Sequence, residues 1–361
     1  MPDLRIVQLT GSTTGGIRGH VRSLAAALAG DHRVILAGPA DVISDPGAGV
    51  RVVPVPITDR PQVSDARNLA RIRTVARGAD VVHAHGLRAG ALAALALSTP
   101  ALARTGLVVT LHNAPVGSGG VRTIAGGLLR AIAARADAVL GVSSDLVAWA
   151  EGHGARLAER ALVPAPKTVP GTPLHGPARR ALGLTMEHRL VLTVARLAPQ
   201  KGLGLLADSA ALLADRVPEA RWLVAGGGPL LDELADQVLG ENLPVILLGR
   251  RNDVPDLLAS ADVLVSTSAW EGQPINLQEA LAAGVPVVAT DVGGTGEVTG
   301  DAARLVPYAD PDALTTQITA VLRDTDLADE LRRAGRRRAG ELPTLADALR
   351  QTLGIYARVI A

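Results

Sequence analysis

Several residue types that limit what a protein can be are missing or scarce in this sequence of 361 residues. It has no cysteine, which excludes disulfides and thiolate metal sites. It has no phenylalanine, three tryptophans and two tyrosines, so its core must be built mainly from alanine, valine, leucine and isoleucine. No run of about 18 purely apolar residues occurs, so we expect no membrane-spanning helix. The formal net charge of +1 is too near zero to indicate nucleic acid as a partner.

The first residues, MPDLRIVQLTGS, lack the charged leader and long apolar run of a signal peptide, so we expect a soluble cytoplasmic protein. The hydrophobic fraction of 48% and the charged fraction of 20% are typical of a folded chain. Because one hydrophobic core rarely grows beyond roughly 250–300 residues, the length predicts two domains.

Short apolar runs alternate with longer amphipathic stretches along the chain, which predicts βαβ units and parallel sheets. The predicted strands of the first half are residues 5–9, 34–36, 50–55, 81–83, 108–111, 138–141 and 161–163. Those of the second half are residues 190–195, 220–225, 245–248, 263–266 and 285–290. The predicted helices include residues 17–29, 121–135 and 275–283, and the tail from residue 310, where Pro343 is expected to start the last helix.

Proline and glycine crowd residues 163–177, which we interpret as a linker without regular structure. The predicted organisation is a first domain over residues 1–163, a linker over 164–188, a second domain over 189–342, and a last helix over 343–361 that returns to the first domain. The predicted fold class is α/β, with two Rossmann-like, doubly wound parallel-sheet domains facing a central cleft.

The first motif is a glycine pair, Gly15 and Gly16, between the first predicted strand and helix. Adjacent glycines let a ligand approach the backbone, and the free N–H groups of a helix start favour an anion. The alternative is an ordinary strand-to-helix turn. The second motif, VARLAPQKG, places Arg196 and Lys201 on the loop after the first strand of the second domain, where two cations suit a diphosphate. The alternative is a pair of solvated surface charges.

The third motif is the stretch from Glu271 to Glu279, which follows the strand at residues 263–266. Pro274 suits the first turn of a helix. The N–H groups at the predicted helix start are then those of Gly272, Gln273, Ile275 and Asn276. Glu271 and Glu279 then face one elongated ligand at two depths, where carboxylates accept hydrogen bonds from hydroxyl pairs. A favourable acidic residue beside a helix start explains Glu271 alone, but leaves Glu279 without a reason.

Together these motifs resemble the retaining family 4 glycosyltransferases (glycosyltransferase group 1), which have the GT-B fold. The resemblance rests on the two glutamates with EGQP, on RLAPQKG and on GVPVVATDVGG, and looser motifs extend it over nearly the whole chain. It implies that Arg196 and Lys201 hold the donor diphosphate, that Glu279 binds the ribose, and that Gly15 and Gly16 approach the diphosphate across the cleft. The remaining implied contacts are to the donor sugar from Glu271, Gly272, Gln273, Pro274 and Ile275, to sugar and acceptor from His112, and to the base from the loop around Gly249, Arg250 and Arg251.

The implied reaction is transfer of a hexose-type sugar, with retention, from a nucleotide-sugar, UDP-sugar first and GDP-sugar next. The hydroxyl acceptor is a small molecule, a glycan or a lipid-linked compound of cell-envelope or natural-product glycoside synthesis. The donor is a co-substrate, and no cofactor or metal is expected. The alternatives are a nucleotide-sugar epimerase of the same fold and a non-catalytic nucleotide-sugar-binding subunit. For His112 the alternative is a structural role, and for the helix at residues 121–135 a peripheral membrane contact competes with packing on its sheet.

Overall fold

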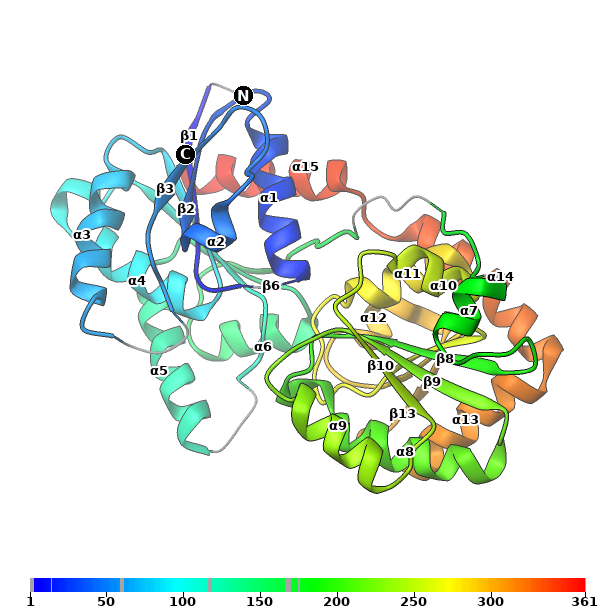
Figure 1. Ribbon diagram of the computed structural model, residues 1–361. Helices are drawn as coiled ribbons and strands as arrows, with labels where there is room; N and C mark the ends of the chain where they lie inside the picture. The colour runs from blue at the N-terminus through cyan, green and yellow to red at the C-terminus, as the bar shows by residue number, and fades with distance from the viewer. Residues whose placement is uncertain are drawn as a thin grey trace. The chain divides into compact units, whose positions relative to one another are not determined.

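The computed structural model describes residues 3–13, 15–58, 62–115, 119–165, 170–174 and 176–360. The chain divides into two compact units (Figure 1). The first unit combines Met1–Pro166 with Pro343–Ala361, and the second unit is Lys167–Leu342. Each unit is a parallel sheet with helices on its faces, as the alternating pattern predicted.

The first unit contains a seven-stranded sheet of order β3-β2-β1-β4-β5-β6-β7. Its strands are β1 (Arg5–Thr10), β2 (Arg33–Gly38), β3 (Val50–Pro54), β4 (Val81–His85), β5 (Gly106–Leu111), β6 (Ala138–Gly141) and β7 (Ala158–Arg160). Its α-helices are α1 (Gly16–Leu28), α2 (Ala40–Ile43), α3 (Asp65–Ala76), α4 (Leu87–Leu97), α5 (Gly119–Arg135), α6 (Ser144–Gly152) and α15 (Leu345–Ile360). The helices α1 and α15 pack together on one face, and α3, α4 and α5 cover the other (Figure 1).

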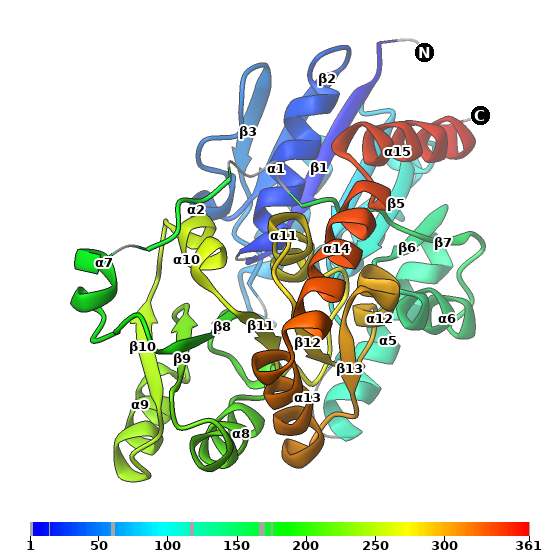
Figure 2. The ribbon, with the colours of Figure 1, turned by 90° about the vertical axis from the view of Figure 1, so that its right-hand side faces the viewer.

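The second unit contains a six-stranded sheet of order β10-β9-β8-β11-β12-β13 (Figure 2). Its strands are β8 (Arg189–Val194), β9 (Ala220–Ala225), β10 (Val245–Gly249), β11 (Val263–Ser266), β12 (Val287–Thr290) and β13 (Arg304–Val306). Its α-helices are α7 (Gly176–Ala181), α8 (Leu203–Arg216), α9 (Leu231–Gly240), α10 (Val254–Ser260), α11 (Ile275–Ala283), α12 (Thr295–Thr299), α13 (Pro311–Arg323) and α14 (Thr325–Glu341). Two apolar clusters, one on each face of this sheet, form its core from aliphatic side chains and the buried Trp222.

The strand order of each sheet reverses at one point. In the first unit β1 lies between β2 and β4, and in the second unit β8 lies between β9 and β11. The loops that leave two such neighbouring strands turn to opposite faces, which opens a crevice at the carboxyl ends of the strands. The predicted site residues follow β1 and β5 in the first unit and β8, β10 and β11 in the second.

Four details of the sequence-based prediction are wrong, and one of them is that the short edge strand β13 was not predicted. The strand predicted at residues 161–163 lies three residues earlier, at β7. The apolar residues that suggested it follow the part that pairs with β6, and β7 itself is half-buried and mostly polar. The segment at residues 163–177 is not wholly irregular, because α7 begins at Gly176 with Pro177 in its first turn, where proline is tolerated. The last helix begins at Leu345 and not at Pro343, since the Thr344 hydroxyl accepts a hydrogen bond from the N–H of Asp347 at its start.

Candidate functional site

In the second unit, Lys201 and Glu271 meet where the strand order reverses. Lys201 ends the short 3₁₀ turn after β8, and Glu271 lies on the loop after the neighbouring strand β11. The Lys201 Nζ donates to Glu271 Oε1 over 2.6 Å, and the Ser268 hydroxyl donates to the same oxygen over 2.6 Å. The side chains of Lys201 and Glu271 are 17% and 10% exposed. Both residues were predicted for the site from the sequence, but their direct ion pair was not.

Two glycines allow the backbones of these loops to approach each other. Gly202, with φ of 60°, lies so close to the Thr267 carbonyl that a Cβ would be 2.1 Å from its oxygen. Gly293, with φ of 51°, lies equally close to the Glu271 carbonyl, and the N–H of Gly294 donates to that carbonyl over 2.9 Å. Only glycine adopts such backbone angles at no steric cost. The VGG segment after β12 therefore fixes the backbone that carries Glu271.

We expect Gly293→Ala to displace Glu271. The new Cβ would stand 2.1 Å from the Glu271 carbonyl oxygen and 2.9 Å from Trp270 Nε1, so the loop must shift. A left-handed backbone angle at a non-glycine residue adds strain of about 1–3 kcal/mol. Urea unfolding should show a loss of this size, and titration with a nucleotide-sugar should show weaker binding.

The control is Gly340→Ala. Gly340 lies in α14, and a Cβ there would meet nothing within 4 Å. Alanine favours a helix over glycine, so this variant should match or slightly exceed the parent in stability. Equal binding and stability in the Gly293 and Gly340 variants would contradict the role assigned to Gly293.

The loop after β8 also carries Arg196, which is exposed and forms no hydrogen bond or ion pair within the described ranges. A run of three glycines after β9 supports this loop. A Cβ at Gly226 would lie 1.7 Å from the Ala195 carbonyl oxygen, and the N–H of Leu197 donates to the Gly227 carbonyl over 3.0 Å. Arg250, at the end of β10, is exposed and lies along Gly227. The structure therefore places both arginines at the carboxyl edge of the same sheet.

The helix α11 spans Ile275–Ala283, as predicted from Pro274. Pro274 precedes the first helical residue, and Gly272 and Pro274 are buried whereas Gln273 and Ile275 are half-buried. The Asn276 side chain donates to the Val194 carbonyl over 3.1 Å, which ties the helix start to the end of β8. Glu279 is half-buried on the second turn, and burial raises the pKa of its carboxyl.

In the first unit, the glycine pair occupies the turn from β1 to α1. Gly15 has φ of 60°, which only glycine adopts readily, and Gly16 is the first residue of the helix. Both are exposed. Their predicted approach to a donor bound by the other domain stays a prediction.

His112 follows β5 and is buried, with its Nε2 3.1 Å from Nδ1 of His85 on the neighbouring strand β4. Two further histidines, His83 and His20, are buried close by. Burial lowers the pKa of all four imidazoles, to about 4 for His20 and about 3 for His83. Within the described part of the chain, no group of three or more His, Asp or Glu side chains has an arrangement that holds a metal ion.

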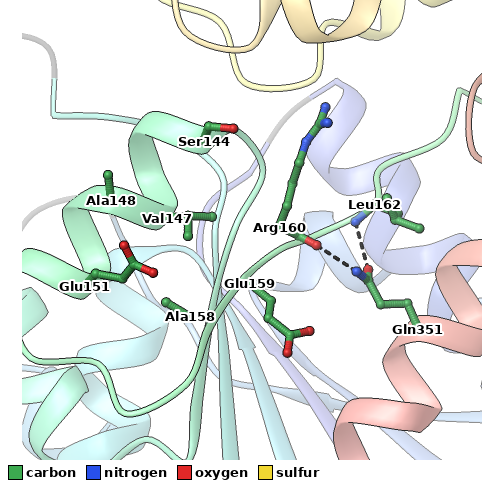
Figure 3. A pocket seen from close by; sticks show the side chains of 9 residues that line it. All are labelled: Ser144, Val147, Ala148, Glu151, Ala158, Glu159, Arg160, Leu162 and Gln351. Carbon is green, nitrogen blue, oxygen red and sulfur yellow. Dashed lines mark hydrogen bonds between the residues drawn. The ribbon is translucent and has the colours of Figure 1, made fainter.

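A separate hollow of about 530 Å³ lies at the edge of the first sheet (Figure 3). It is lined by α6, β7 and Gln351 of α15. Gln351 bridges the backbone of Arg160 and Leu162, and Arg358 pairs with both carboxylate oxygens of Glu159. None of the predicted site residues lines this hollow. Its polar contacts join α15 to β7.

Two family models match the chain on either side of the linker. One describes glycosyl transferases group 1 and matches residues 177–338, and the other describes a glycosyl transferase 4-like domain and matches residues 15–166. The chain belongs to the group 1 glycosyltransferases. The resemblance to this family inferred from the motifs is thereby confirmed, and retention of configuration stays a prediction.

The curated relatives of this group 1 glycosyltransferase differ in how much they share with it. A GDP-mannose-dependent alpha-(1-6)-phosphatidylinositol monomannoside mannosyltransferase of Mycolicibacterium smegmatis is 28% identical over 89% of both chains. A UDP-Gal:alpha-D-GlcNAc-diphosphoundecaprenol alpha-1,3-galactosyltransferase of Escherichia coli is 33% identical over 32% of this chain. A lipopolysaccharide core biosynthesis mannosyltransferase, LpsB of Rhizobium meliloti, is 37% identical over 34% of this chain. The chain spans only 31% and 36% of the length of the last two.

Solved structures confirm the fold class of this group 1 glycosyltransferase as GT-B with two Rossmann-like domains. HepE of Anabaena, solved in complex with UDP-glucose, has a TM-score of 0.79 at 23% identity, over 98% of this chain and 99% of that one. WaaG, a glycosyltransferase involved in lipopolysaccharide biosynthesis, has a TM-score of 0.73 at 17% identity, over 97% and 99%. The predicted cleft between the domains stays a prediction.

Several residues of this glycosyltransferase that support the site were not predicted from the sequence. They are Ser268, which holds Glu271, and the glycines at 202, 226–228 and 293–294, which let the loops approach. The available signal was the position of these glycines, each directly beyond the end of a strand or beside a predicted ligand. Their partners are distant in sequence, so the need for glycine follows only from the folded backbone.

The amino-terminal half of α5 differs from the packed helix that sequence analysis favoured. Val121 is 47% exposed and Ile124 is 66% exposed, and burial begins at Ala125. No helix in the described ranges is both long and apolar enough to cross a membrane. A peripheral membrane contact of α5 stays a prediction.

Proposed function

We propose that the chain is a retaining glycosyltransferase that moves a hexose-type sugar from a UDP-sugar to a hydroxyl acceptor. The observation that carries this proposal is the cluster of Lys201, Glu271 and Ser268 at the strand reversal of the second unit, beside the start of α11. A cation and a carboxylate held side by side match the two chemistries of a nucleotide-sugar, which presents an anionic diphosphate and a neutral sugar rich in hydroxyls.

In this proposal the cations bind the diphosphate and the carboxylates bind hydroxyls. Lys201 and Arg196 contact the phosphates with the N–H groups at the start of α11, while Glu271 accepts from the sugar and Glu279 from the ribose. The raised pKa of Glu279 reflects a desolvated carboxyl, to which ribose hydroxyls would supply the missing hydrogen bonds. Arg250 lies by the base.

The reaction breaks the bond between the anomeric carbon and the leaving phosphate oxygen. The acceptor oxygen attacks from the same face, its proton passes to a leaving phosphate oxygen, and the new glycosidic bond keeps the anomeric configuration. Negative charge grows on the diphosphate as the bond breaks, so fixed positive charge beside it lowers the barrier. The proposal assigns this charge stabilisation to Arg196, Lys201 and backbone N–H groups, without a metal ion.

Binding of UDP-sugars is supported by the HepE structures, whose ligands include UDP and UDP-glucose. The mycobacterial relative that matches over 89% of both chains depends on GDP-mannose, so GDP-sugars are the second candidate. The curated relatives named above carry transferase names, which gives the epimerase alternative no support.

A thermal-shift screen with UDP-, GDP-, ADP- and dTDP-sugars tests the donor assignment. A ligand at a hundred times its dissociation constant adds about 2.7 kcal/mol to the free energy of unfolding. We expect the largest shift with a UDP-sugar, and its loss in Glu279→Ala. A larger shift with a GDP-sugar would replace UDP by GDP as the donor nucleotide and leave the assignment as a glycosyltransferase unchanged.

Product analysis with the best donor distinguishes a glycosyltransferase from an epimerase and from a non-catalytic binding subunit. A transferase without acceptor releases free sugar slowly by hydrolysis, whereas an epimerase yields a second nucleotide-sugar. Donor binding with neither hydrolysis nor transfer across an acceptor panel would overturn the catalytic proposal in favour of a binding subunit.

A further inference from the structure

Polar side chains fill the centre of one face of the first sheet, where a parallel sheet under helices normally carries apolar residues. The register aligns Gln8 of β1 with His83 of β4, and His85 of β4 with Thr110 of β5. These four side chains are buried, as is Tyr356 of α15, which packs above them. Buried polar groups are stable only when they are hydrogen-bonded, so their contacts identify the arrangement that the fold preserves.

Two branches of hydrogen bonds run from Tyr356. In one, the Tyr356 oxygen lies 2.8 Å from His83 Nδ1, and His83 Nε2 lies 2.7 Å from the Thr110 hydroxyl. In the other, Gln8 Nε2 donates to the Tyr356 oxygen over 2.7 Å, and Gln8 Oε1 lies 2.6 Å from His85 Nε2. This second branch continues to His112, whose Nε2 lies 3.1 Å from His85 Nδ1.

The donors and acceptors of the second branch can be assigned one by one. Burial holds the pKa of His85 and His112 well below the usual range, so each imidazole is neutral and carries one proton. The Gln8 carbonyl oxygen only accepts, so the proton of His85 is on Nε2. His85 Nδ1 then accepts, and the proton of His112 must be on Nε2. Nδ1 of His112 remains as an acceptor, and no described residue donates to it.

We propose that Gln8, held by Tyr356 and acting through His85, is a positioning residue that fixes His112 in the Nε2–H form, so that Nδ1 accepts a hydrogen bond from a substrate hydroxyl. This inference rests on the proposed function only for the identity of the ligand, a sugar or an acceptor alcohol. His20 also faces the pair, with its ring centroid 6.3 Å from that of His85 and 6.0 Å from that of His112. It forms no hydrogen bond within the described residues, so it does not set either proton.

Nitrogen-15 NMR of histidine-labelled protein without donor tests the assignment directly, because the two neutral forms differ in their nitrogen shifts. The His112 signals are identified by their loss in His112→Asn. We expect the Nε2–H form in the parent protein. The Nδ1–H form in the parent would overturn the proposal, whatever the enzyme transfers.

Three variants test whether Gln8 acts on His112 through His85. Gln8→Met removes the acceptor of His85 Nε2–H, so the His85 proton is better placed on Nδ1. His85 Nδ1–H then donates to His112 Nε2, which leaves the His112 proton on Nδ1. Gln8→Glu keeps an acceptor for His85 whether or not the new carboxyl is protonated. Thr110→Val is the matched control, because it removes one buried hydrogen bond from the other branch only.

We expect Gln8→Met to show the Nδ1–H form and about 10-fold lower kcat/KM, the loss expected for one hydrogen bond to a substrate hydroxyl. Gln8→Glu and Thr110→Val should keep the Nε2–H form and kcat/KM within about 2-fold of the parent. If Gln8→Met fails to fold, Tyr356→Phe replaces it, since the Gln8 amide is then free to rotate and present its nitrogen to His85.

Two results are kept apart by this design. An unchanged His112 signal and full activity in Gln8→Met would overturn the positioning role. If the Nε2–H form is found and depends on Gln8, but His112→Ala transfers sugar at the parent rate, the positioning role stands and the assignment of His112 to the substrate site fails.

Discussion

Turnover of a nucleotide-sugar is expected to fall at least ~100-fold when Lys201 is replaced by alanine, and similarly for Arg196→Ala. The Lys201 ammonium is held 2.6 Å from Glu271 and its side chain is only 17% exposed. In the proposed function its charge therefore acts on the leaving diphosphate in a partly desolvated place, where it has a larger effect than in water. Among the described side chains, its loss also leaves Glu271 with only the Ser268 hydroxyl as a hydrogen-bond partner. Steady-state kinetics with the best donor from the thermal-shift screen measure the effect.

Arg332→Ala is the control for this experiment. Arg332 forms an exposed pair with Asp329 on α14, and such pairs contribute about 0–1 kcal/mol to stability. Its turnover should equal that of the parent. Parent-like turnover in both Lys201→Ala and Arg196→Ala would remove the diphosphate assignment, while leaving the fold and the family unaffected.

The second large effect is on stability in acid. The first unit buries His20, His83, His85 and His112 in neutral form, with the pKa of His20 lowered to about 4 and that of His83 to about 3. In the unfolded chain these imidazoles take up protons as the pH falls through about 6.5. The unfolded state then binds more protons than the folded state, so stability falls as the pH falls from about 6.5 towards about 3 and is unaffected above that window. Each additional proton bound by the unfolded state lowers the free energy of unfolding by about 1.4 kcal/mol per pH unit.

Hydrogen exchange at about pH 7 and about pH 5, corrected for intrinsic rates, measures this effect separately in each unit. Protection of β4 and β5 should fall steeply, whereas β8 and β11 serve as the internal control. In the described part of the second unit, the only histidine is His188, and the pKa of Glu279 is raised, which opposes acid destabilisation there. Equal losses of protection in the two units would contradict the prediction.

Much of the site was predictable because its chemistry is attached to features that short sequence segments define. Strand ends, a proline at a helix start and charged residues just beyond a buried strand placed Arg196, Lys201 and Glu271 at one edge of one sheet. The side-chain contacts between neighbouring loops at that edge were not predictable. The contact between Lys201 and Glu271 joins residues 70 positions apart and depends on β8 and β11 being neighbours.

The histidine network shows a second limit. His83 and His85 are two residues apart on β4, which places them on one face of the sheet. The sequence does not indicate that α15, at the far end of the chain, supplies Tyr356 to that face. The edge strands β7 and β13 were misplaced or missed because an edge strand needs little apolar surface and leaves a weak pattern.

The pairing of Lys201 with Glu271 also bears on how quickly a donor is captured. Opposite charges in contact cancel at a distance, so this pair contributes little to the field that a diphosphate meets in solution. Arg196 and Arg250 are exposed and have no such partner among the described residues, so in the proposed function the long-range attraction comes from these two arginines. In the proposed function the cations therefore act at different times. The exposed arginines govern the association rate and its dependence on ionic strength. Lys201 acts after contact, when the diphosphate binds its ammonium and the sugar hydroxyls bind the Glu271 carboxylate.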